Sequence, residues 1–135
     1  MKLFWLMTIF LTGCLLVTCS LDSRVKIERA VIETRSIRDA EREFKKTFGR
    51  YASMDELISR NLIPFRPGTG LTSDFLYECQ ADDNSYELTV REKALPNKGN
   101  DDDSLSLYVD QSGVIRGAYD AKTVANRSSI PIGVQ

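Results

Sequence analysis

The chain has 135 residues, of which 42% are apolar and 27% are charged, with a formal net charge of −1 and no histidine. This length suffices for one domain. The absence of histidine excludes Ser-His, Cys-His and His-metal sites, and the near-neutral charge argues against nucleic acid as a partner, because binding to phosphates needs a basic surface.

An uncharged, apolar run of 19 residues extends from Leu3 to Leu21, directly after Met1 and Lys2. A short basic start followed by an apolar run is typical of a secretory signal, and this run approaches the ~20 residues that span a bilayer as a helix. We therefore expect residues 1–21 to be a signal peptide, a lipoprotein signal or a membrane anchor. Residues 22–135 are then expected to form a single exported domain in a bacterial cell envelope, facing the periplasm.

The sequence leaves three fates open for this segment. The string Leu11-Thr12-Gly13-Cys14 resembles a bacterial lipobox, in which the cysteine receives a lipid, and Cys19 is an alternative attachment site. Cleavage after Ser20 and retention as a signal anchor are the other two. Both cysteines can also be simple apolar residues of the segment, since cysteine behaves as a small hydrophobe.

Cys79 is the only cysteine after residue 21, so the domain has no internal disulfide. A catalytic thiol needs a base or a positive neighbourhood, but Cys79 lies between Glu78 and Gln80. We expect a buried strand residue.

The first predicted element after the apolar run is a helix of about 25 residues, from an N-cap at Asp22-Ser23 to a C-cap at Gly49. Its apolar residues recur at mostly helical spacing: Ile27, Ala30, Val31, Ile37, Ala40, Phe44 and Phe48. Its exposed face is expected to carry pairs four residues apart: Arg29 with Glu33, Arg35 with Asp39, and Glu41 with Lys45.

A short second helix is predicted from a capping box at Ser53-Met54-Asp55-Glu56, in which Glu56 reaches back to the cap. Leu57, Ile58 and Leu62 would be its buried residues, and Asn61 and Pro64 would end it.

Alternating apolar and polar residues then predict four strands joined by turns. Their inward residues are Phe75, Tyr77 and Cys79; Tyr86, Leu88 and Val90; Leu105, Leu107 and Val109; and members of the run 114–119. The last dozen residues predict no clear element. Helices followed by antiparallel strands indicate an α+β fold, with both helices packed on a four-stranded antiparallel sheet.

Charge is divided unevenly along the chain. Residues 22–50 hold nine bases and six acids, whereas residues 51–135 hold eight bases and thirteen acids. Two interpretations fit this division. The charges can lie on two separate surfaces that both face water, or one subunit's basic helix can pack head-to-tail on another subunit's acidic sheet. In the second case Arg29, Arg35 and Arg38 would be the interaction face.

Three strings resemble the type IV pilin and pseudopilin family. The first is Ala40-Glu41, with Phe44, Phe48-Gly49-Arg50-Tyr51 and Met54-Asp55-Glu56-Leu57; the second is the stretch 108–116, and the third is the tail 125–132. This resemblance implies a pilin-like α+β domain that acts by contact with pilin-like subunits or with itself, in a pilus or a type II secretion-like apparatus.

The front of the chain departs from that family. A prepilin has Phe-Thr-Leu-Ile-Glu after its glycine, whereas Gly13 is followed by Cys14. Because this prepilin motif is missing, what remains of the resemblance implies a pilin-like head on a lipid or single-helix tether.

Asp101, Asp102 and Asp103 form the densest acidic cluster and are a weak candidate for Ca²⁺, which some pseudopilins hold in such a loop. The spacing of an EF-hand is missing, and a solvated turn is the simpler interpretation. No G-x-S-x-G, Walker A or dinucleotide-binding glycine pattern is present. We expect no enzymatic activity and no cofactor.

Overall fold

The computed structural model describes residues 2–93, 104–119 and 124–132, with side chains from Ser23 onward. One long helix, α1 (Lys2–Phe48), is followed by a short helix, α2 (Met54–Ser59), and a 3₁₀ turn, η1 (Gly70–Thr72). Five strands follow: β1 (Phe75–Ala81), β2 (Tyr86–Glu92), β3 (Leu105–Asp110), β4 (Arg116–Tyr119) and β5 (Ile130–Pro131). The predicted α+β class is confirmed.

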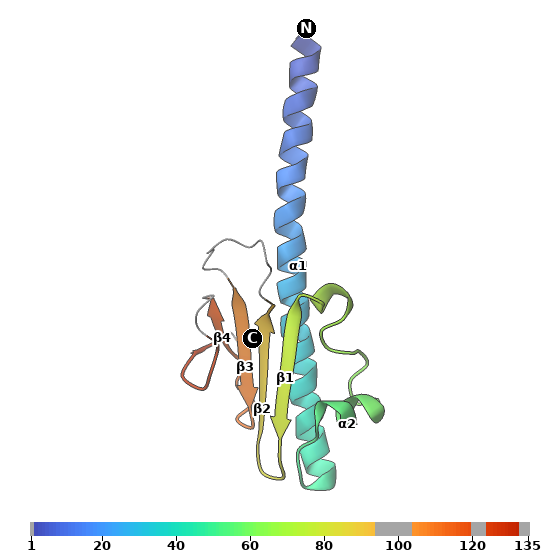
Figure 1. Ribbon diagram of the computed structural model, residues 1–135, viewed down its shortest axis with the longest axis vertical. Coiled ribbons are helices and arrows are strands. Elements are labelled where there is room, and N and C mark those ends of the chain that lie inside the picture. The colour runs from blue at the N-terminus through green and yellow to red at the C-terminus, as the bar shows by residue number, and fades with distance from the viewer. Residues whose placement is uncertain (1, 94–103, 120–123, 133–135) are drawn as a thin grey trace.

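Helix α1 does not begin at the predicted N-cap. It runs without interruption through Asp22 and Ser23 from Lys2 (Figure 1). A capping side chain acts only where the preceding backbone leaves the helix, and the apolar run contains no proline to force such a break. The predicted end is confirmed: Gly49 takes φ +75°, and its N–H donates to the Lys45 carbonyl at 2.9 Å.

The five strands form one antiparallel sheet in chain order. The four predicted strands are confirmed and β5 is additional, because two residues are too few to show an alternating pattern. Pro131 is compatible with this position, since β5 is an edge strand and proline has no N–H to donate.

The sheet packs across the C-terminal half of α1, where core contacts begin at Ile27 (Figure 1). Rows of inward residues follow from the strand register, for example Cys79 beside Leu88 and Leu88 beside Val109. The helix contributes four fully or almost fully buried apolar residues to this core: Ala30, Ile37, Ala40 and Phe44. The N-terminal half of α1 extends past the sheet (Figure 1).

Strand β3 is buried along its whole length. Its inward residues were predicted, but its outward ones, Ser106, Tyr108 and Asp110, are also buried. The chain after residue 123 covers them: the Ala125 N–H donates to the Ser106 hydroxyl at 2.7 Å, and the Arg127 guanidinium to Asp110 at 3.0 Å. A sequence pattern of period two cannot reveal a cover that comes from a distant segment.

Candidate functional site

The three arginines of the predicted interaction face do not lie on one side of α1. Arg29 and Arg38 are nine residues apart, which is two and a half turns, so they point in opposite directions. Arg29 pairs with Glu33 at 3.2 Å, whereas Arg38 pairs with Asp39 at 2.9 Å and lies beside the turn at Gly113. Arg35 is half-buried between these directions.

Two other sets of predicted residues lie outside what the structure describes. Asp101, Asp102 and Asp103 belong to the undescribed segment 94–103, and the side chains of Cys14 and Cys19 precede the first described side chain. Among the described residues, no group of three or more metal-ligating side chains comes together. From Ser23 onward, where the structure describes side chains, no helix has a stretch long and apolar enough to cross a membrane.

Glu33 is a buried carboxylate that accepts hydrogen bonds both from its own helix and from elements packed against that helix. It receives the hydroxyl groups of Thr72 at 3.0 Å and Tyr77 at 2.9 Å, in addition to the predicted partner Arg29. These bonds join α1 to η1 and β1. The spacing that revealed the pair with Arg29 carried no signal for the two hydroxyl donors, which are about forty residues away.

Glu41 was predicted to pair with Lys45 on an exposed face, and this is wrong. Its carboxylate is fully buried and accepts from the Ala52 N–H at 2.9 Å and from the Cys79 thiol at 3.9 Å. Lys45 turns away and donates to the carbonyls of Gly49 and Asp83, both at 2.7 Å. Glu41 occupies the core stripe between Ile37 and Phe44 rather than the solvent side of α1.

Burial sets the protonation of this pair. Desolvation raises the pKa of Glu41 to about 7, partly opposed by the hydrogen bond from Ala52. Desolvation and the neighbouring Glu41 raise the pKa of Cys79 to about 12, so its thiol stays protonated and a poor nucleophile at neutral pH. The arrangement is suited to holding α1 against β1, not to nucleophilic attack.

A basic pocket of about 140 Å³ lies between the last turns of α1 and one end of the sheet. Its lining includes four cationic residues of α1, two tyrosines and the β3–β4 turn: Arg38, Arg42, Lys45, Lys46, Tyr51, Tyr86, Gln111 and Gly113. The predicted basic face named only Arg38 of this set. Tyr51 and Tyr86, 35 residues apart in the chain, both line the pocket, and their ring centres are 5.0 Å apart.

A larger hollow of about 570 Å³ lies at the sheet edge formed by β4 and β5. Two apolar side chains in it are strongly exposed, Tyr119 at 63% and Ile130 at 79%.

Comparison of the chain with protein-family models, curated proteins and solved structures gives no match.

Proposed function

We propose that this chain is a non-enzymatic, envelope-tethered, pilin-like protein that acts by protein–protein contact, in association with a type IV pilus or a type II secretion-like apparatus. The observation that carries the proposal is the form of α1. A single helix of 47 residues packs into the head over its C-terminal half, and its other half contains the uncharged run from Leu3 to Leu21. Such a helix can hold a head at a membrane and still pack against other helices.

The surface of α1 next to the head supports this proposal. Val25 and Ile32 are seven residues apart and therefore on one side of the helix, and they are 43% and 51% exposed. In coiled coils, apolar side chains at this spacing contact the partner helix. The exposed Tyr119 and Ile130 at the sheet edge offer a second apolar surface to a partner.

A test compares the full-length chain with two variants in bacterial membranes, by chemical cross-linking and identification of the cross-linked subunits. Val25→Lys combined with Ile32→Lys is expected to abolish cross-linking to itself or to pilin-like subunits, because both side chains would place charge on the contact side. The prediction that Leu62 is a buried residue of the second helix is wrong, because Leu62 is 40% exposed and lies just after α2. Leu62→Lys is therefore the matched control.

Cross-linking that survives the double substitution would contradict contact through this side of α1. A chain that yields only monomers would contradict the proposed function itself.

The second candidate function is a free-standing lipoprotein that binds a small ligand or an envelope component. The basic pocket between helix and sheet is the observation that favours it.

A further inference from the structure

Two of the four cations in the basic pocket lack a carboxylate partner among the described residues. Arg38 pairs with Asp39, and Lys46 pairs with Glu43 at 2.6 Å. Lys45 donates only to backbone carbonyls, and Arg42 has no described ion pair or side-chain hydrogen bond. Lys45 is satisfied as a hydrogen-bond donor, but its charge and that of Arg42 are not balanced by a bonded anion.

Asp82 and Asp110, which belong to the turns at this end of the sheet, accept hydrogen bonds from other groups. Asp82 accepts from the N–H groups of Asn84 and Ser85 at 2.7 Å, and these bonds lower its pKa. Asp110 accepts from Arg127 and from the Ser112 N–H. Lys45 also attracts the Asp82 carboxylate at longer range and lies 5.2 Å from the centre of the Tyr51 ring. Arg42 is therefore the pocket cation with the least internal compensation among the described residues.

The turn at Gly113 brings the Arg42 guanidinium into the pocket wall. A Cβ at this glycine would lie 2.9 Å from an Arg42 terminal nitrogen and 3.8 Å from Arg38 Cδ. Gly113 has φ +74°, which favours glycine, so the turn and the approach of the arginine depend on the same residue. Arg42 is an exposed residue, and its guanidinium lies beside this backbone turn.

Size and charge together select the ligand class. A volume of about 140 Å³ is well below the ~300 Å³ or more of sites for drug-sized molecules, and one water takes ~30 Å³ of liquid. The pocket therefore has room for a small polar group. Arginine and lysine in combination suit an oxyanion with more than one charge, because guanidinium binds phosphate through two parallel hydrogen bonds.

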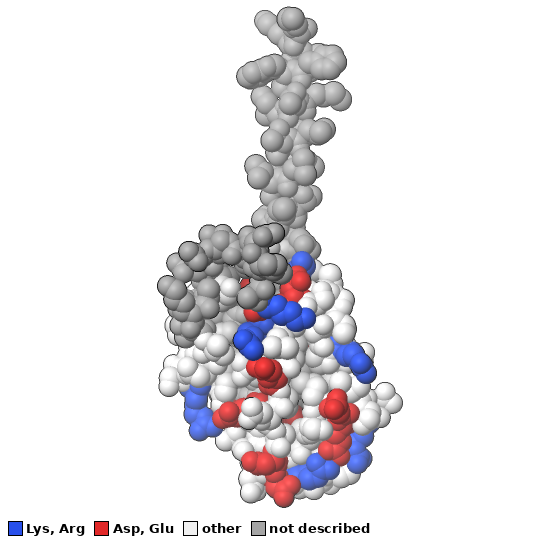
Figure 2. Space-filling view, viewed as in Figure 1, with Lys and Arg blue, Asp and Glu red and all other residues white. Residues whose placement is uncertain are grey.

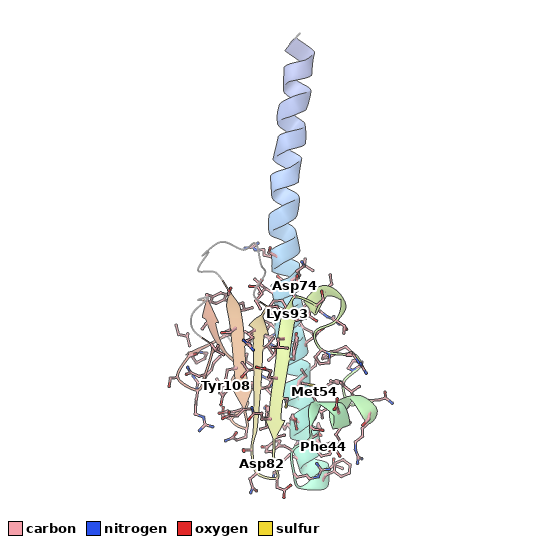
Figure 3. The ribbon with its side chains drawn as sticks, viewed as in Figure 1. Phe44, Met54, Asp74, Asp82, Lys93 and Tyr108 are labelled. Carbon is pink, nitrogen blue, oxygen red and sulfur yellow. The ribbon has the colours of Figure 1, made fainter. Side chains whose placement is uncertain are left out.

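We propose that this basic pocket binds a phosphate-type oxyanion carried by a free ligand, with Arg42 as the principal contact. The same chemistry is present in anionic lipid headgroups, but the pocket is at the wrong end of the head for them. Arg42 lies 21 residues after Leu21, or roughly 30 Å along the helix. Figure 3 places Phe44 and Asp82, which neighbour pocket residues, at the opposite end of the head from Asp74. The inference is independent of assembly through α1.

The test is calorimetric titration of the full-length chain in phosphatidylcholine vesicles with sodium pyrophosphate, against sodium chloride at matched ionic strength. Saturable binding is expected for the native chain. Arg42→Gln should weaken it at least about tenfold, since a charge-assisted hydrogen bond contributes about that much. Arg24→Gln is the matched control, because Arg24 is an exposed arginine of the same helix outside the pocket.

Two results would overturn the proposal: absence of saturable binding, or equal weakening by the two substitutions, which would indicate a general charge effect. The titration is repeated in phosphatidylglycerol vesicles at ~0.1 M salt, where surface charge is screened beyond ~10 Å. Unchanged pyrophosphate binding there supports a free ligand. Its loss would show that lipid headgroups occupy the pocket and would overturn that assignment.

Discussion

At the scale of single residues, Glu41 is a carboxylic acid in a place where most helices carry an apolar side chain. Its pKa of about 7 in the folded chain compares with 4.5 for an unperturbed group. Between these values the folded state keeps a proton that the unfolded chain releases. The contribution of Glu41 to stability is therefore greatest at low pH, falls as pH rises through this window, and changes no further above it.

Glu41→Gln removes that pH dependence while keeping an oxygen that accepts from the Ala52 N–H. We expect the variant to match the native chain near pH 5 and to be about 1–2 kcal/mol more stable near pH 8. The full pKa difference corresponds to about 3 kcal/mol, and solvent screening reduces it. Urea unfolding at the two pH values measures the difference. Glu43→Gln, at an exposed carboxylate of the same helix, should give a constant offset; a constant offset for Glu41→Gln would contradict the account.

At the scale of elements, local signals determine most of what the sequence could predict. Gly49, the Ser53 cap and the alternating strands depend on residues close in sequence, and all of them are confirmed. The start of α1 was wrong because Asp22 and Ser23 lie inside a longer helix. The burial of Glu41 was missed because its donors, Ala52 and Cys79, come from other elements.

The capping box of α2 is half confirmed and leads to a prediction. Ser53 accepts from the Glu56 N–H at 3.2 Å, but the Glu56 carboxylate binds Arg50 at 2.7 Å. Ser53→Ala should therefore destabilise the chain by about 1 kcal/mol through loss of the cap, as measured by thermal or urea unfolding. Ser53→Asp keeps an accepting oxygen and should stay close to the native stability. Equal losses in both variants would show that the cap contributes nothing.

At the scale of the whole molecule, acidic and basic side chains are intermixed on the visible surface of the head (Figure 2). Figure 2 shows acidic and basic side chains interspersed over the visible face of the head, so the division between residues 22–50 and the remainder does not produce a basic side and an acidic side in this view. The basic pocket was not predictable, because it needs Tyr86 and Gly113 to be brought to the end of α1 by the sheet. The sequence shows the four cations that line the pocket, but nothing in it distinguishes them from the other fourteen lysines and arginines.

The central claim is that the head stays tethered to the envelope through its N-terminal segment. The most direct measurement is the intact mass of the protein from membrane and soluble fractions of a bacterial host. We predict a membrane-bound protein, with the mass of the full chain or of a chain that begins at Cys14 or Cys19 and carries lipid. An unmodified chain that begins at Leu21 and is recovered in the soluble fraction would contradict the claim.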